Sequence, residues 1–239
     1  MFTKKVFLCV AACLLIGVVS SAPAAITLDI LTPGFEAGVA PGGWINYNPG
    51  DTLVEGWVWH PSYRGGQSIV HDGSNIVAWA TFNYLEPQTS LLYQDLQYAD
   101  TSPVLVAGGD TYTVSAQFMQ PYGGNFGSVE VGIMDSVSET VLASQTYVGD
   151  PAVYVGGPTQ DVTFNLTLPT SPVGVGNTAR LYFTSTDIPA SPPDLPQWNK
   201  GMDNVSVTLT SGEVPEPSTL VLLAAGLFGL LAYAWKKRR

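Results

Sequence analysis

Residues that could carry hydrolytic or metal chemistry are sparse in this sequence. Its two histidines, His60 and His71, stand eleven residues apart without the ligand spacing of a zinc site. No Gly-x-Ser-x-Gly elbow and no phosphate-cradling glycine loop occurs. His71 and Asp72 offer two members of a triad, but any chain of 239 residues holds such pairs. Paired acids for glycoside hydrolysis cannot be recognised in a sequence, because their separation is three-dimensional. We therefore expect a protein that is not an enzyme.

Aromatic side chains in glycine-rich surroundings suggest binding instead. The segment 57–67, WVWHPSYRGGQ, combines flat rings with hydrogen-bonding groups. Sugar rings stack on such rings, while amides and charged groups bond the hydroxyls. The alternative is that the rings pack inside the protein core, where they bury much area. We favour this alternative for Trp57 and Trp79. The ligand-binding candidates are Trp59, Tyr63, Arg64, Gln67 and Trp198.

Charge excludes one class of partner. Residues 25–214 carry 3 basic and 18 acidic side chains, a net charge of −15. Nucleic-acid binding depends on Lys and Arg neutralising phosphates, so we expect no nucleic-acid partner. Such an acidic surface attracts cations.

The elements that must position these residues are strands. Five segments alternate apolar and polar residues with a period of two, which is typical of half-buried antiparallel strands. Their inward faces are expected to hold Tyr112, Val114, Ala116 and Phe118; Val162, Phe164, Leu166 and Leu168; Val129, Val131 and Ile133; Ala179, Leu181 and Phe183; and Val205, Val207 and Leu209. Further candidate strands are 27–31, 67–71, 75–82, 90–97 and 140–148.

Turn formers separate these strands, and no amphipathic helix is evident between residues 25 and 212. Many short strands joined by Gly- and Pro-rich turns predict an all-β fold, an antiparallel β-sandwich or jelly roll, as one domain over 25–212.

The order of short motifs resembles galactose-binding-like jelly rolls, the fold of many carbohydrate-binding modules. PGFEAG, GGW and EGWVW come first, then HDGSNIVAW, SLLYQDL and TYTVSAQF, and GMDNVSVTL comes last. The resemblance implies a structural calcium ion that ties the first strand region to the last, with Glu36 and Asp203 as its carboxylate ligands. Carboxylate and carbonyl oxygens suit that ion. The alternative is that both side chains cap turns. Thr32-Pro33 stands where the family usually has Asn.

The N-terminus predicts export. A basic start with Lys4 and Lys5, an apolar core and the small residues Ala22 and Ala24 have the layout of a secretory signal peptide over 1–24. Both cysteines, Cys9 and Cys13, lie inside it, so the mature chain is expected to contain no thiol.

The C-terminus predicts a membrane helix. The 17 residues from Thr219 to Trp235 are uncharged, near the short limit for crossing a bilayer. The four basic residues that follow place this end in the cytoplasm. Pro215 and Pro217 block helix formation just before the span.

The segment VPEPSTLVLLAAGLFGLLAYAWKKRR resembles the PEP-CTERM sorting signal of Gram-negative bacteria that make exopolysaccharide, with Val214, Pro215, Glu216 and Pro217 as its motif. The resemblance implies cleavage near this motif by an exosortase. An ordinary tail anchor with a proline-rich stalk is the alternative. The signal is expected to fill 213–239, with the transmembrane helix at about 219–235.

These observations predict an exported protein that is processed by signal peptidase and by an exosortase. It would stay transiently in the inner membrane and then reach the cell surface or extracellular matrix of a Gram-negative bacterium. Its sandwich is expected to bind extracellular polysaccharide or matrix. The alternatives are a structural surface protein without a ligand pocket and, more weakly, an enzyme on the same fold.

Overall fold

A computed structural model describes residues 24–31, 35, 45–46, 52–54, 57–59, 67–71, 74–81, 89–119, 127–149, 159–186 and 197–212. In these ranges the chain forms strands, turns and extended segments. Within them, no helix is long and apolar enough to cross a membrane. The expected signal helix and C-terminal helix lie outside the described residues.

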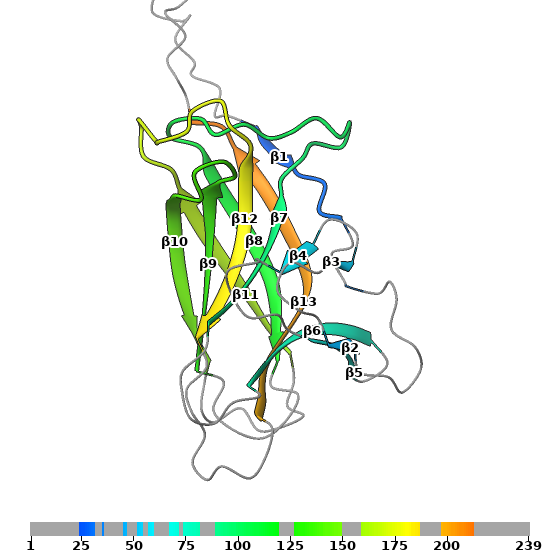
Figure 1. Cartoon of the computed structure of the whole chain (residues 1–239). Helices are drawn as coiled ribbons and strands as arrows, with labels where there is room; N and C mark the ends of the chain where they lie inside the picture. The colour runs from blue at the N-terminus through cyan, green and yellow to red at the C-terminus, as the bar shows by residue number, and fades with distance from the viewer. Residues whose placement is uncertain are drawn as a thin grey trace, which may run out of the picture.

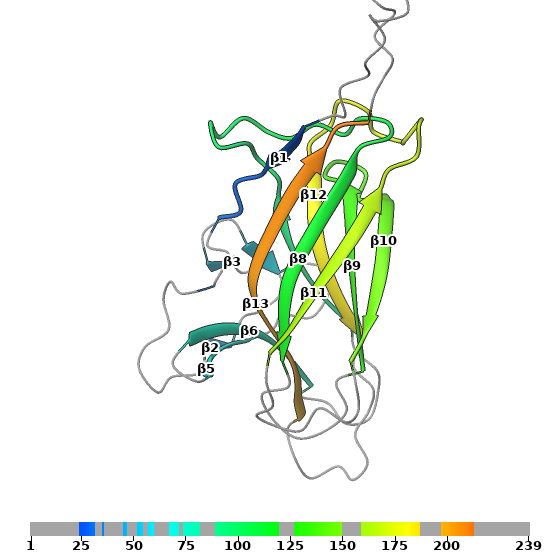
Figure 2. The ribbon, with the colours of Figure 1, turned by 180° about the vertical axis from the view of Figure 1, so that it is seen from behind.

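The strands form two antiparallel sheets that face each other (Figures 1 and 2). The seven-stranded sheet runs in the order β11 (Gln160–Thr167), β8 (Thr111–Met119), β13 (Gln197–Thr210), β6 (Ser74–Thr81), β5 (Gln67–His71) and β2 (Ile45–Asn46), with β1 (Ala25–Thr27) also paired to β13. The six-stranded sheet runs β10 (Val141–Val148), β9 (Ser128–Asp135), β12 (Ala179–Thr186), β7 (Thr89–Asp95), β4 (Trp57–Trp59) and β3 (Thr52–Val54). This confirms the predicted all-β sandwich.

The core lies between the sheets and is built from the predicted inward faces. The expected inward residues are buried, apart from Val162, which is half-buried and packs against the core. Phe118 stands among aromatic neighbours from three other strands, with ring centroids 5.1 Å from Tyr147, 6.3 Å from Phe164 and 6.5 Å from Phe183. Period-two alternation therefore specified the inward faces of both sheets.

One lateral edge of the sandwich is closed by contacts between β10 and β11. The Gln145 amide donates to the Asn165 carbonyl at 3.0 Å, and the Tyr147 hydroxyl donates to Gln160. On the outer face of the seven-stranded sheet, hydroxyl and amide side chains pair between β8 and β11, as in Ser115 with Thr163 at 3.0 Å. That face is polar.

Several predicted strand boundaries were wrong. The segment 27–31 is not a strand; β1 ends at Thr27, and the chain continues through an isolated bridge at Asp29. Strand β13 starts at Gln197, seven residues before the alternating segment, because two irregularities in its pairing shift the alternation. The short strands β2, β3 and β4 were not predicted as strands, since two or three residues are too few to show a period.

Candidate functional site

Outward-facing tyrosines line up across the six-stranded sheet. Val58, Tyr93, Tyr182 and Gly132 are register partners on β4, β7, β12 and β9, and we call them the tyrosine row. Gly132 leaves room for the neighbouring ring, because an added Cβ would stand 2.6 Å from Cε1 of Tyr182. The Tyr182 hydroxyl donates to Glu130 Oε1 at 2.5 Å. The ring therefore lies along the sheet surface instead of pointing into solvent.

This outer face carries a second apolar cluster. Leu91, Met134 and Tyr182 are buried although they point away from the core, and Tyr93 packs against them. An outer sheet face that meets only water normally alternates to polar residues. The outer face of the six-stranded sheet therefore differs from the polar outer face of the other sheet, because it carries buried apolar side chains.

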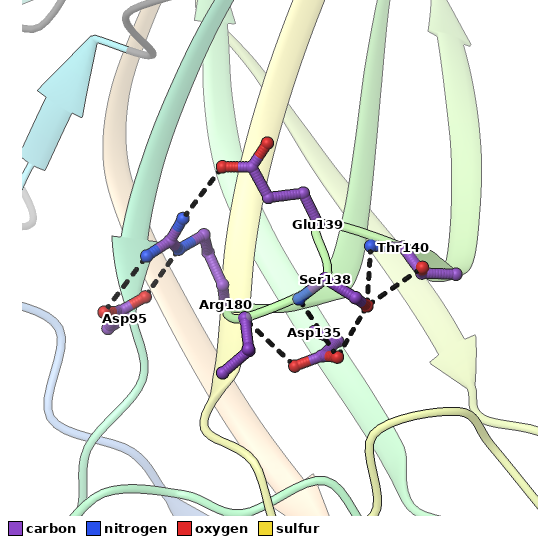
Figure 3. Close-up of polar contacts among 7 residues, drawn as sticks. Asp95, Asp135, Ser138, Glu139, Thr140 and Arg180 are labelled. Atoms are coloured by element: carbon purple, nitrogen blue, oxygen red, sulfur yellow. Dashed lines mark hydrogen bonds and ion pairs between the residues drawn. The ribbon is translucent and has the colours of Figure 1, made fainter.

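Arg180 lies next to Tyr93 of the tyrosine row. It forms ion pairs with Asp95 and Glu139 (Figure 3). Its guanidinium binds Asp95 with two contacts, Nε to Oδ1 at 2.6 Å and Nη2 to Oδ2 at 3.3 Å. It lies 4.0 Å from the centroid of the Tyr93 ring, and its Nη1 is 3.9 Å from Oε1 of Glu139. The Arg180 side chain is 11% exposed, whereas those of Asp95 and Glu139 are 52% and 50% exposed. Both carboxylates are therefore about half accessible to solvent although each contacts Arg180.

Asp135 fixes the loops beside this cluster (Figure 3). Its carboxylate accepts the Ser138 hydroxyl at 2.6 Å, the Val137 amide at 3.0 Å and the Asn177 side-chain amide at 3.2 Å. The hydroxyl bond from Ser138 lowers the pKa of Asp135 most. Partial desolvation raises the pKa, and the amide donors Val137, Asn177 and Ser138 lower it further. The turn 136–138 and the loop around Asn177 are therefore held together by one carboxylate.

The predicted ligand-binding residues are distributed over both sheets. The Trp59 backbone pairs with Leu92 in the six-stranded sheet, while Gln67 and Trp198 lie on either side of β6 in the other sheet. Their side chains, and the whole of Tyr63 and Arg64, lie outside the described residues.

Three of the tryptophans considered in the sequence, Trp57, Trp59 and Trp198, lie in strands. The Trp-Val-Trp segment pairs with β7, and the start of β13 pairs with β6. Trp57 is fully buried, with its ring 5.5 Å from Phe35, which confirms it as a core residue.

Sequence reasoning missed Tyr93, Arg180 and Tyr182. All three lie in segments predicted as strands, at the positions that alternation assigns to the outer face. An arginine and two tyrosines at outward positions, where the other strands carry Thr and Ser, were the available signal.

The residues around the predicted calcium site offer suitable oxygens. Asp203 is buried beside an irregularity of β13, where its carboxylate accepts the Asn204 amide at 2.7 Å. Glu36 lies outside the described residues. Near it in sequence, the Leu31 carbonyl accepts bonds from Trp57 and from Gln94. The buried Oε1 of Gln94 has no hydrogen-bond partner among the described residues. Calcium prefers such oxygens, so the donor types fit. No group of three or more His, Cys, Asp or Glu side chains in the described ranges forms a metal cluster.

Comparison with solved structures shows the fold. The arabinose-bound α-L-arabinofuranosidase MgGH51 aligns over 80% of this chain and 27% of its own, at 14% identity and a TM-score of 0.52. The apo form of a cyclase from Fischerella sp. aligns over 80% of this chain and 98% of its own, at 16% identity and a TM-score of 0.52. A carbohydrate-binding module, the non-crystalline-cellulose-specific CBM28, aligns over 66% and 94%, at 11% identity and a TM-score of 0.39.

No curated protein matches the chain. One segment does match a known family. Residues 213–239, which include Val214, Pro215, Glu216 and Pro217, fit the description of the PEP-CTERM protein-sorting motif. The body thus has an antiparallel β-sandwich fold like those of the arabinofuranosidase and the cyclase, and residues 213–239 match the PEP-CTERM protein-sorting motif.

Proposed function

We propose that this protein is exported, sorted to the cell surface through its C-terminal motif, and binds extracellular polysaccharide with its sandwich. The motif at 213–239 indicates export and membrane-anchored sorting, with an exosortase as the processing partner. Signal peptidase would act at the other end of the chain. We further propose that the host is a Gram-negative bacterium and that the ligand is its exopolysaccharide.

The observation that carries the binding proposal is the charged edge of the tyrosine row. Asp95 and Glu139 present half-exposed carboxylates beside the Arg180 guanidinium and the Tyr93 ring. Carboxylates accept and guanidinium groups donate hydrogen bonds, and charge-assisted bonds are stronger than neutral ones. Sugar hydroxyls can use both kinds of group, and the apolar face of a sugar ring can stack on an aromatic ring. The residues predicted from the sequence, Trp59 on β4, Gln67 on β5 and Trp198 on β13, would either add to this binding surface or form the binding surface in its place.

Binding without catalysis is part of the proposal. The sandwich of the Fischerella cyclase shows that a chain of this fold can belong to an enzyme, so catalysis is the weaker alternative. A structural protein whose outer face binds no ligand is the stronger alternative. Retention on polysaccharide distinguishes binding from the structural role, and substrate turnover would be required for an enzyme.

Affinity electrophoresis of the mature chain in gels that contain soluble polysaccharides tests the proposal. We expect Tyr93→Ala to reduce the retardation by a bound polysaccharide roughly ten-fold, the equivalent of about 1.4 kcal/mol. Asp95→Asn should reduce it as well. Thr163→Ala, on the polar outer face of the other sheet, is the matched control and should bind normally.

The predicted residues enter the same assay as Trp59→Ala, Tyr63→Ala and Trp198→Ala. Loss of retention in these variants, with Tyr93→Ala unchanged, would place the ligand away from the tyrosine row. A wild-type chain that no polysaccharide retards would favour the structural alternative.

A further inference from the structure

Exposed apolar side chains gather at one end of the sandwich. Val137 is 74% exposed, Val175 66%, Val173 61% and Leu105 48%. They lie in the turns where β9 and β11 finish and in the loop that follows β7, all at the end toward which β13 also runs (Figures 1 and 2). We call these four residues the apolar tip. Scattered exposed apolar residues need no explanation, but a group of them in adjacent loops is typical of a contact surface.

The loops that carry the apolar tip are hydrogen-bonded to one another. The Ser136 amide donates to the Thr178 carbonyl at 3.1 Å, and the Val106 amide donates to the Asn177 carbonyl at 2.8 Å. The Gly176 amide donates to the Val106 carbonyl at 3.1 Å. The Asp135 carboxylate, at the end of β9, accepts a bond from the Asn177 side chain and so links the turn after β9 to the loop after β11. The tip is therefore a preformed surface, because each loop is fixed to its neighbour.

The chain leaves the described sandwich at this same end. The Gly212 amide donates to Asp110 Oδ1 at 3.0 Å, and a Cβ on Gly212 would stand 2.6 Å from the Gly109 carbonyl oxygen. The Gly109 amide in turn donates to the Pro169 carbonyl at 3.1 Å, at the start of the loop that carries Val173 and Val175. The exit toward the sorting motif is thus held beside the apolar tip.

Chain length keeps this end close to the membrane. The sorting motif begins one residue after Gly212, and the uncharged run begins at Thr219. Seven residue steps span at most about 25 Å when fully extended. A chain anchored by the run 219–235 therefore holds the exit, and the tip beside it, within reach of the lipid surface. Such a tether raises the effective concentration of a weak contact.

We infer that the apolar tip rests on the bilayer surface while the C-terminal segment holds the chain in the membrane. This inference depends on the anchoring in the proposed function. The ligand is the apolar interfacial region of neutral lipid, because the tip has no described basic patch and the body is strongly acidic. Several nearby carboxylates already have partners within the protein: Asp135 with Ser138, Asp110 with Gly212, and Glu139 with Arg180. The contact orients the tyrosine row along a side of the sandwich, away from the membrane plane.

Site-specific fluorescence on the chain of residues 25–239, which lacks the signal peptide but keeps the C-terminal segment, tests this orientation. The sequence has cysteines only at Cys9 and Cys13, so the chain without its signal peptide accepts single labels at Val137→Cys or Val175→Cys. Val148→Cys is the matched control, since Val148 is 69% exposed and ends β10 at the opposite end of the sandwich. Each variant carries an environment-sensitive dye and is reconstituted into phosphatidylcholine vesicles that contain a lipid-borne quencher. Flotation of the vesicles reports anchoring separately.

We expect blue-shifted emission and loss of most of the intensity to the lipid quencher at positions 137 and 175, with neither change at position 148. Raising the salt concentration should not reverse the effect, because the contact is apolar. Flotation with no quenching at 137 and 175 would overturn the inference and leave the anchoring intact. A blue shift that grows with protein density but is insensitive to the lipid quencher would also overturn it, since the tip would then meet a second copy. Failure to float would overturn the anchoring and the inference together.

Discussion

At the scale of single residues, the loop around Gly174 depends on a glycine for two separate reasons. Its φ of +74° lies in the left-handed region, and the carboxyl carbon of Asp135 would stand 2.6 Å from an added Cβ. Gly176, two residues later, has a φ of +88°, but an added Cβ would meet nothing within 4 Å. The two glycines therefore separate backbone strain from a steric clash.

We expect Gly176→Ala to lower the free energy of unfolding by about 1–2 kcal/mol, the cost of a left-handed conformation for an ordinary residue. Gly174→Ala should lower it further, because the new methyl group also displaces the Asp135 carboxylate and the bonds that it accepts. Urea denaturation of the purified mature chain measures both. Equal losses in the two variants would show that the Asp135 contact adds nothing.

The hydrogen bonds to Asp135 predict a loss of stability in acid. Its folded pKa lies below the ordinary value of 3.8, chiefly because of the Ser138 hydroxyl bond. A carboxylate with a lowered folded pKa stabilises the fold above its unfolded pKa, and this contribution is lost as the pH falls through the folded pKa. Between about pH 7 and about pH 3, the wild type should lose more stability than Asp135→Asn.

Urea denaturation across the pH range measures this difference, and Ser138→Ala, which removes the largest cause, should show an intermediate slope. Identical pH profiles for wild type and Asp135→Asn would contradict the assignment.

At the scale of elements, the sequence predicted the strands whose alternation is long enough to observe. Strands β8, β9, β11 and β12 run for eight or nine residues and were placed with the correct inward face. Strands β2 to β4 were missed because pairing with a long neighbour, not local pattern, makes two or three residues extended. The irregularity after Asp203, where Asn204 has a φ of +49°, inserts an extra residue that no period reveals.

The same contrast explains the candidate site. Aromatic content drew attention to segment 57–67, but residues on four different strands form the tyrosine row through sheet order. Sheet order depends on contacts far apart in the chain, such as that of Arg180 with Asp95, so local sequence carries little information about it.

Calcium would join two elements that are remote in sequence, the region after β1 and the middle of β13. If Glu36 and Asp203 share the ion, EDTA should lower the melting temperature of the mature chain and added calcium should restore it. A ligand present at 100 times its dissociation constant contributes about 2.7 kcal/mol.

Differential scanning calorimetry measures the shift. Glu36→Gln and Asp203→Asn should each abolish the response to EDTA, whereas Asp161→Asn, on exposed β11, should retain it. A wild type that is insensitive to EDTA would support the view that both acids only cap turns.

At the scale of the whole molecule, the sandwich and the sorting motif divide two tasks. The body carries 18 acidic and 3 basic residues between 25 and 214, whereas the four residues after Trp235 are all basic. This asymmetry fits the proposed arrangement of an exported body and a cytoplasmic tail, since basic residues flank the cytoplasmic side of membrane helices. The apolar tip beside Gly212 then lies where the two parts meet.

Sorting is the property of the whole chain that one set of substitutions can remove. Replacing Pro215, Glu216 and Pro217 together with Ala leaves the apolar run 219–235 and the basic tail in place, so membrane insertion should persist. An exosortase that recognises Pro-Glu-Pro should then fail to cut, and the protein should remain full length in the inner membrane of a host that has the enzyme. Pro192, Pro193 and Asp194 provide a matched control of similar composition outside the motif, and their replacement should leave processing unchanged. Intact mass and membrane fractionation read the result together, because an uncut chain retains the mass of its C-terminal segment. Normal cleavage of the Pro215–Pro217 variant would leave a simple tail anchor as the explanation of this end of the chain.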